Sequence, residues 1–220
     1  MTGMTEKRVA DFLHSLEPEE DGLLSELRLY AEEHNVPIVR RETESFLRTL
    51  SALRKPERVL EIGTAIGYST IVLAESKAQI ITIENYEKRI PVARENLRRA
   101  GLSDRVTLIP RDAGDVLKEL SENGETFDLI FLDAAKGQYL LWLPLILRLL
   151  GDGSVLVTDN VLQEDTVMES RYTVSRRDRT THQRMREFLY EIKHSPCLLT
   201  SVLPVGDGVA FSVYHKPCEE

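Results

Sequence analysis

The sequence predicts an α/β fold in which one mostly parallel β-sheet is covered by helices on both faces. Two observations predict it: short apolar segments suited to buried strands recur between residues 58 and 160, and segments with helical spacing of apolar residues separate them. Strand and helix thus alternate as in βαβ units, which favour a right-handed, doubly wound sheet. With 220 residues, 42% of them hydrophobic, the chain fits a single domain, 1–220.

The first 55 residues are expected to form helices that precede the sheet. Apolar residues recur there at spacings of three and four, and Pro18, Pro37 and Pro56 interrupt the pattern. We therefore divide the predicted domain into an N-terminal helical extension, 1–55, and an α/β core, 56–220.

Five apolar segments are the predicted parallel strands of the core. They are RVLEIG (58–63), QIITIE (79–84), RVTLIP (105–110), FDLIFLD (127–133) and SVLVTDN (154–160). The predicted helices between them cover 69–76, 88–100, 113–120 and 139–150. Gly101 and Gly151 are expected to end the second and fourth of these helices, because glycine suits the position after a helix.

The alternation ends after residue 160. A polar segment leads to a predicted helix over about 180–193, and CLLTSVLPVGDGVAFSVYH then contains two apolar segments around a glycine-rich turn at 205–208. This pattern predicts a β-hairpin at the end of the chain.

Composition argues against a membrane or secreted protein. No segment approaches the roughly 18 to 20 apolar residues of a membrane span, and charged residues lie where a signal peptide needs an apolar segment. We expect a cytoplasmic protein. Its two cysteines, Cys197 and Cys218, are too few for a disulfide framework or a thiolate metal site and are expected to be free thiols.

The net charge of −8 argues against a protein that coats nucleic acid, but one segment has the opposite balance. Residues 171–186 contain six arginines and a single acid, Asp178. Such a cluster can attract phosphates even on an acidic protein, although a solvated loop without a partner is the alternative. The arginines are Arg171, Arg176, Arg177, Arg179, Arg184 and Arg186.

A glycine-containing turn follows the first predicted strand. In EIGTAIGYS, from Glu61 to Ser69, glycines between a strand and a helix let the backbone approach a nucleotide-like ligand, but their spacing is not that of a dinucleotide or triphosphate site. Glu84 ends the second strand, where an acid can accept hydrogen bonds from ribose hydroxyls. Together they favour a ribose-bearing ligand. The alternatives are a plain tight turn and, for Glu84, a cap on the next helix.

Two acids and an amide follow the fourth and fifth predicted strands. Asp133 ends the fourth strand, and Asp159 and Asn160 end the fifth. Because the carboxyl ends of parallel strands share one edge of a sheet, these side chains should converge on a cleft. Their oxygens suit Mg²⁺ or Mn²⁺ better than Zn²⁺, since no His or Cys joins them. Lys136 could act there as a base or an electrostatic partner, unless it is solvated and the acids only cap loops.

In this order and spacing, EIGTAIGYS, Glu84, FLDAAK and VTDN resemble the cation-dependent O-methyltransferase family that includes the catechol and caffeoyl-CoA enzymes. The resemblance extends from about Val36 onward. It implies a Rossmann-like class I methyltransferase fold: N-terminal helices, then a mostly parallel seven-stranded sheet closed by a C-terminal antiparallel hairpin. It also implies S-adenosylmethionine (SAM) as cofactor, a requirement for Mg²⁺ or Mn²⁺, and a homodimer.

The resemblance also implies roles for individual positions. Catalysis would involve Lys136 and Asp133. The metal would be held by Asp133, Asp159 and Asn160. The cofactor would contact Asp133 and, from its methionine end through the ribose to the adenine, Val39, Glu61, Gly63, Ser69, Glu84 and Ala113.

Two departures from the family pattern concern the substrate. Ala135 stands where the catechol enzyme has Trp and many relatives have Asp, which weakens the case for a small, tightly sandwiched aromatic substrate. The sequence RRDRTTHQRMREFLYE resembles the bacterial branch that methylates 5-hydroxyuridine in tRNA. The resemblance thus implies that the wobble 5-hydroxyuridine of tRNA becomes 5-methoxyuridine. The implied RNA contacts are Arg40, Arg41, Arg171, Arg176, Arg177 and Arg179.

Three other functions fit part of the pattern. Small catechols and caffeoyl-CoA-like phenols can chelate a metal as O5 and O4 of 5-hydroxyuridine do, and the phosphates of coenzyme A also attract arginines. A non-catalytic nucleotide- or RNA-binding module could share the fold but has no evident need for a metal set. A nicotinamide-dependent oxidoreductase fails on the glycine spacing and leaves the metal residues unexplained.

Overall fold

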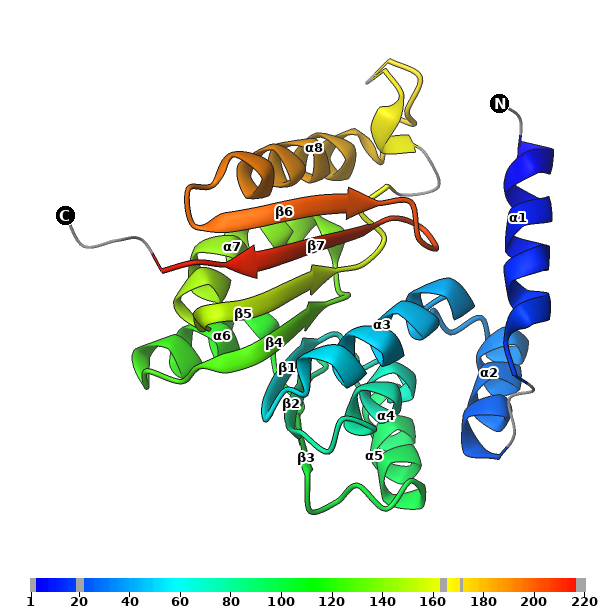
Figure 1. Ribbon diagram of the computed structural model, residues 1–220, viewed down its shortest axis with the longest axis vertical. Helices are drawn as coiled ribbons and strands as arrows, with labels where there is room; N and C mark the ends of the chain where they lie inside the picture. The colour runs from blue at the N-terminus through cyan, green and yellow to red at the C-terminus, as the bar shows by residue number, and fades with distance from the viewer. Residues whose placement is uncertain (1–2, 19–21, 163–165, 171, 217–220) are drawn as a thin grey trace.

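Helices flank a central sheet in the computed structural model of the chain (Figure 1), which describes residues 3–18, 22–162, 166–170 and 172–216. Seven strands form one sheet in the order β3-β2-β1-β4-β5-β7-β6. The five strands from β1 to β5 pair in parallel, whereas β7 lies antiparallel between β5 and β6. The predicted Rossmann-like fold, with its mostly parallel sheet and C-terminal antiparallel hairpin, is confirmed.

Three helices precede the sheet, as predicted: α1 (Gly3–Leu16), α2 (Leu23–His34) and α3 (Arg41–Arg54). Helix α1 stands away from the sheet (Figure 1), and His14 Nε2 lies 3.1 Å from Glu42 Oε1 of α3. No helix within the described ranges is both long and apolar enough to cross a membrane.

The strands and helices of the core follow the predicted alternation. The strands are β1 (Arg58–Ile62), β2 (Gln79–Ile83), β3 (Val106–Ile109), β4 (Phe127–Leu132), β5 (Leu150–Thr158), β6 (Leu198–Leu203) and β7 (Val209–Tyr214). The helices are α4 (Tyr68–Ala74), α5 (Ile90–Arg99), α6 (Ala113–Glu122), α7 (Tyr139–Arg148) and α8 (Arg179–His194). Two short 3₁₀ turns are η1 (Lys136–Gln138) and η2 (Thr166–Met168).

The predicted end of the helix at 139–150 is wrong. Helix α7 ends at Arg148, and Leu150 already pairs with Phe127 as the first residue of β5. The N–H of Phe127 donates to the carbonyl of Leu149 at 2.9 Å. This carbonyl therefore pairs with β4 instead of accepting a hydrogen bond within the helix. The left-handed glycine in this segment is Gly153, with φ 75°, rather than Gly151.

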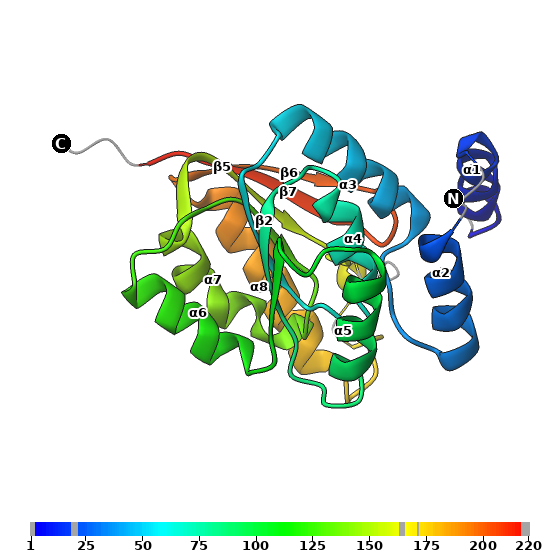
Figure 2. The same ribbon diagram turned by 90° about the horizontal axis from the view of Figure 1, so that it is seen from below.

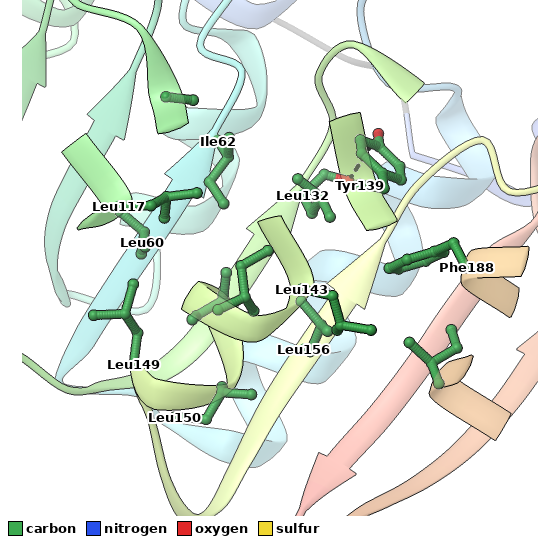
Figure 3. Close-up of a cluster of buried hydrophobic side chains, with 14 of the residues drawn as sticks. Leu60, Ile62, Leu117, Leu132, Tyr139, Leu143, Leu149, Leu150, Leu156 and Phe188 are labelled. Carbon is green, nitrogen blue, oxygen red and sulfur yellow. Dashed lines mark hydrogen bonds between the residues drawn. The ribbon is translucent and has the colours of Figure 1, made fainter. Parts of the chain in front are cut away.

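Two apolar cores lie on opposite faces of the sheet. Helices α3, α4 and α5 cover one face, and α6, α7 and α8 cover the other (Figure 2). On β1, Leu60 and Ile62 pack toward α6–α8 (Figure 3), whereas Val59 packs into the opposite core. All three are fully buried, and burial of such side chains stabilises the fold by about 1.5–3 kcal/mol each.

The turn between β6 and β7 holds the segment that follows β5. The N–H groups of Val161 and Leu162 donate to Gly208 and Asp207 at 2.9 and 3.1 Å. Gly208 has φ 86°, and a Cβ there would lie 2.3 Å from Cγ of Leu162, so only glycine allows this approach. Near the hairpin, Cys197 is a free, half-buried thiol, while Cys218 lies outside the described residues.

Candidate functional site

A cavity of about 440 Å³ lies at the carboxyl ends of the parallel strands. Six of the seven predicted cofactor positions line it, contributed by the segment before α3, the turn after β1, the ends of β2 and β4, and the first residues of α4 and α6. Lys136 and Asn160 line the same cavity. The six are Val39, Gly63, Ser69, Glu84, Ala113 and Asp133.

Gly63 brings the turn after β1 into direct contact with the end of β4. Its φ is 108°, and a Cβ built there would lie 1.9 Å from the backbone carbonyl oxygen of Asp133. The N–H groups of Gly63 and Thr64 donate to the carbonyl of Ile83 at 3.0 and 3.2 Å. The turn therefore runs against both neighbouring strands, which leaves no room for a side chain at this position.

The Glu84 carboxylate is fixed at the edge of the cavity by backbone donors. Its Oε2 accepts from the N–H of Ala65 at 2.8 Å, and its Oε1 accepts from the N–H groups of Asn85 and Tyr86 at 3.0 and 2.8 Å. Helix α5 begins only at Ile90, so Glu84 does not cap it. Glu84 instead joins the glycine-containing turn to the loop after β2.

Glu61 is the one predicted cofactor residue that does not line the cavity. It alternates with Leu60 and Ile62 along β1, so its side chain points toward α4 and is fully buried. Ser69 and Thr82 donate their hydroxyls to the carboxylate at 2.6 Å each, and Thr70 donates as well. Glu61 therefore fixes Ser69 and the beginning of α4 by hydrogen bonds and does not itself face the cavity.

Burial raises the pKa of Glu61 to about 7, despite the lowering by hydrogen bonds from Ser69, Thr70 and Thr82. Folding therefore favours the protonated form. The stabilisation is complete below pH 4.5 and is lost as the pH rises to about 7, which amounts to on the order of 3 kcal/mol. We expect a Glu61→Gln variant to lose this pH dependence of the free energy of unfolding. Denaturant unfolding at pH 5 and pH 7.5 checks it, and equal pH dependence in both proteins would contradict it.

The three predicted metal ligands lie together where β4 and β5 end. Asp159 is fully buried; its Oδ1 accepts from the Thr43 hydroxyl at 3.4 Å, while its Oδ2 is buried with no hydrogen-bond partner among the described residues. Burial, and then the negative charge of Asp133, raise the pKa of Asp159. Asn160 has φ 54°, a left-handed conformation that asparagine tolerates better than most residues.

This set is one amide and two carboxylates, and no group of three or more His, Cys, Asp or Glu side chains suited to a metal occurs in the described ranges. Its chemistry nevertheless fits a hard divalent cation, because such ions take oxygen ligands and often retain water in the other positions. The unpartnered Oδ2 of Asp159 is the atom that most needs such a partner.

The side chain of Lys136 lies against two of the three predicted metal ligands. Its Nζ donates to Oδ1 of Asp133 at 2.7 Å, to Oδ1 of Asn160 at 2.8 Å and to the Tyr139 hydroxyl at 3.0 Å. Burial disfavours the ammonium, but Tyr139 and Asp133 outweigh it and raise the pKa of Lys136 above its usual value. An ammonium has no lone pair to accept a proton, so this arrangement favours the electrostatic partner over the base.

The predicted RNA-binding arginines are in different environments. Arg176 and Arg177 are exposed, and Arg40 and Arg41 lie at the beginning of α3. Arg179 is half-buried, and its Nε lies 3.4 Å from the carbonyl of Val174. Arg171 lies outside the described residues.

The other two arginines of the segment are bound within the fold. Arg184 donates to the carbonyl of Gly137 at 2.9 Å, and Arg186 donates to the carbonyl of Val167 at 2.7 Å. The sequence cluster is therefore only partly a basic surface.

Sequence reasoning missed three side chains of the site. Tyr139 binds Lys136, Thr43 donates to Asp159, and Trp142 lines the cavity near Gly114. Tyr139 follows Lys136 by three residues, a spacing that could have indicated a contact. Thr43 gave no such signal, because it lies 116 positions from Asp159 in the sequence.

Comparison with known proteins shows which family the chain resembles. A family model described as O-methyltransferase matches residues 14–214. Catechol O-methyltransferase of Niastella koreensis is 36% identical over 160 residues, which cover 70% of this chain and 72% of that protein. Caffeoyl-CoA O-methyltransferase 1 of Eucalyptus globulus is 29% identical over 210 residues, 89% of this chain and 82% of that protein.

A solved structure agrees with these relatives. The O-methyltransferase from Bacillus cereus in complex with SAH has a TM-score of 0.82 and 30% identity, and the alignment covers 94% of this chain and 97% of that one. The family match over nearly the whole chain and the agreement in fold lead to one conclusion: the chain belongs to the O-methyltransferase family.

Proposed function

We propose that the protein transfers the methyl group of SAM to the O5 hydroxyl of 5-hydroxyuridine in tRNA, with the help of a divalent cation. One observation carries the chemical part of the proposal: residues predicted for the cofactor and residues predicted for the metal line the same cavity. The volume of about 440 Å³ is within the usual range for small-molecule sites. The Bacillus cereus relative was solved with SAH, the demethylated form of SAM, which supports SAM as the donor.

The methyl donor would bind at the carboxyl ends of the parallel strands. Gly63, Glu84 and Ala113 all line the cavity there. In this proposal Gly63 would let the backbone approach the methionine part, Glu84 would offer carboxylate oxygens to the ribose hydroxyls, and Ala113, the first residue of α6, would contact the adenine. The donor methyl would then face Asp133 and Lys136. Methyl transfer requires the oxygen nucleophile in line with this methyl at about 3 Å, so positioning supplies much of the rate.

Asp133, Asp159 and Asn160 would hold Mg²⁺ or Mn²⁺, and the bound cation would lower the pKa of a coordinated hydroxyl. The protein's own contribution to charge stabilisation is the Lys136 ammonium, which lies at the same place. The proton of the acidified hydroxyl would go to solvent, and the ammonium would stabilise the remaining oxyanion without acting as the base.

Exposed arginines in the segment before α8 support the tRNA substrate. Arg176 and Arg177 lie in the segment before α8 and are exposed, and they can bind phosphates or stack on unpaired bases. Ala135 lines the cavity with a small side chain, which leaves space for a base presented by a large substrate. In the protein as proposed, RNA contacts would also come from Arg40, Arg41, Arg171 and Arg179.

A second candidate is O-methylation of small catechols or of caffeoyl-CoA-like phenols. The names of the relatives from Niastella koreensis and Eucalyptus globulus favour it. The two substrate classes present the same pair of neighbouring oxygens to a metal, so the cavity alone does not separate them.

Parallel assays separate the candidates. We expect transfer of labelled methyl from SAM to tRNA that contains 5-hydroxyuridine at a rate at least about 100-fold above that for catechol or caffeoyl-CoA, because phosphate contacts add binding energy. An Arg176→Ala/Arg177→Ala double variant should raise KM for tRNA and weaken its salt dependence, while turnover of a small phenol stays the same. Methylation of the phenols alone would reverse the assignment, and binding of tRNA without any methyl transfer would indicate a non-catalytic module.

We also propose that the protein is a homodimer in which a second copy covers α1. Four large apolar side chains of α1 are 42–65% exposed, which is unusual for a helix that contacts water alone. Sedimentation equilibrium should give a mass near 50 kDa, twice 25.1 kDa, and Phe12→Glu should shift it to the monomer. A wild-type monomer at micromolar concentration would contradict the proposal. The exposed residues are Val9, Phe12, Leu13 and Leu16.

A further inference from the structure

The side chain of Lys136 is fixed by hydrogen bonds although the residue lies in the short turn η1. Lysine has four rotatable side-chain bonds, and fixing them costs up to about 2 kcal/mol of conformational entropy. Lys136 nonetheless has three oxygen partners within 3.0 Å, and its side chain is only 21% exposed. Residues that hold the turn therefore decide where the ammonium lies.

Tyr139 holds the turn from within the core. Its ring is fully buried and packs edge-on against Phe188, with centroids 5.5 Å apart (Figure 3). Its hydroxyl accepts from Lys136 Nζ at 3.0 Å and from the N–H of Ala134 at 3.1 Å, and its proton faces the carbonyls of Leu132 and Ala134 at 3.4 and 3.3 Å. A hydroxyl has one proton and two lone pairs, so its capacity is fully used. The hydroxyl thus joins the end of β4 to Lys136.

Arg184 holds the same turn from outside. It extends from α8 and donates from Nη1 to the carbonyl of Gly137, the residue after Lys136, at 2.9 Å. Helix α8 packs directly on the turn, since a Cβ built at Gly137 would be in ordinary van der Waals contact with this nitrogen at 3.7 Å and with the Thr181 hydroxyl at 3.9 Å. An arginine of the basic sequence cluster is therefore committed to the loop of the site rather than to a substrate.

We propose that Tyr139 and Arg184 are positioning residues that together place the Lys136 ammonium against Asp133 and Asn160. Arg184 thereby links α8, which follows directly on the exposed arginines, to the reacting groups. The inference rests on the proposed methyl transfer for its kinetic consequence: a displacement of about 1 Å at reacting groups can cost about 100-fold in rate. The hydrogen bonds themselves are independent of which substrate is methylated.

The kinetic test uses variants that remove one hydrogen bond each. Tyr139→Phe keeps the ring, and Arg184→Met keeps most of the aliphatic stem. Both are expected to lower kcat by about 10- to 100-fold while KM for SAM stays near the wild-type value. Arg184→Lys, which retains one charged donor, should recover part of the loss. Tyr139→Phe should also lower the melting temperature by a few degrees, because the N–H of Ala134 loses its acceptor, whereas Arg184→Met should not.

Two matched controls come from α8. Arg186→Met removes an equivalent arginine-to-carbonyl hydrogen bond from the same helix but away from Lys136, and Tyr190→Phe removes an exposed hydroxyl. Both should leave kcat unchanged. If Arg184→Met instead raises KM for tRNA alone and leaves phenol turnover intact, Arg184 is a phosphate ligand and its positioning role is wrong.

A spectroscopic test does not depend on the substrate. A lysine ammonium that is held by three oxygens exchanges its protons slowly and gives a resolved ¹H–¹⁵N signal, which Lys136→Met assigns by its loss. We expect this signal to disappear or broaden in Tyr139→Phe and Arg184→Met and to persist in Arg186→Met. A signal that persists in both positioning variants would overturn the inference, whereas a lost signal in a protein that methylates neither tRNA nor phenols would refute only the proposed function.

Discussion

Replacing Gly63 with alanine is expected to lower the free energy of unfolding by about 3 kcal/mol or more and to abolish cofactor binding. The new Cβ would lie 1.9 Å from the carbonyl oxygen of Asp133, so one of the two backbones must move. Whichever moves, the turn after β1 or the loop with Asp133 loses its place at the cavity. For a chain of this size the melting temperature should fall by roughly 6–12 °C, which calorimetry measures together with SAM affinity.

Gly124→Ala is the control that separates this clash from backbone strain. Gly124 also has a positive φ, 69°, but nothing lies within 4 Å of a Cβ at that position. It should therefore cost only about 1 kcal/mol, the difference between glycine and alanine in this conformation. Equal destabilisation by the two substitutions would show that the contact with Asp133 is unimportant.

Asp159→Asn is expected to reduce methyl transfer by about 10³-fold, or about 4 kcal/mol, and to weaken Mn²⁺ binding strongly. The substitution removes one of the two negative charges of the proposed metal set but keeps its shape. It should not destabilise the metal-free protein, since Oδ2 of Asp159 is buried with no hydrogen-bond partner in the described part of the chain, and an unpaired buried charge is costly. A functional loss with no loss of stability is the expected signature.

Mn²⁺ titration by calorimetry, unfolding without metal, and turnover before and after chelation measure the three effects. Asp104→Asn, at an exposed carboxylate, serves as the charge-matched control and should change none of them. Full turnover of the wild-type protein after exhaustive chelation would exclude the metal altogether, and unchanged Mn²⁺ affinity in Asp159→Asn would exclude this ligand.

The strands and the residues at their ends could be predicted because local pattern determines both. Buried parallel strands require continuous apolar segments, and polar residues can follow them only at the edge of the sheet, which placed Gly63, Glu84, Asp133 and Asn160 at one cavity. The end of α7 was mispredicted because pairing with β4, a tertiary contact, overrode the signal of Gly151.

The direction of individual side chains and their long-range partners could not be predicted from the sequence. Glu61 stands between Leu60 and Ile62, which pack toward α6–α8, and the alternation of the strand turns its own side chain to the opposite face. A cluster of arginines does not reveal which members point inward, and only the packing of α8 on η1 showed that Arg184 does. Whether Lys136 is a base depends on Tyr139 and Asn160, which become its neighbours only in the folded chain.

The position of β7 between β5 and β6 has a consequence for how the site is completed during folding. The turn before β7 supplies the carbonyls of Asp207 and Gly208 that fix the backbone just after Asn160. A sheet paired only from β3 to β5 would already bring together the strand ends that line the cavity, yet its edge at β5 would be open and the backbone after Asn160 would lack this support. The backbone beside the proposed metal ligands is therefore fixed only when the β6–β7 hairpin has paired with β5.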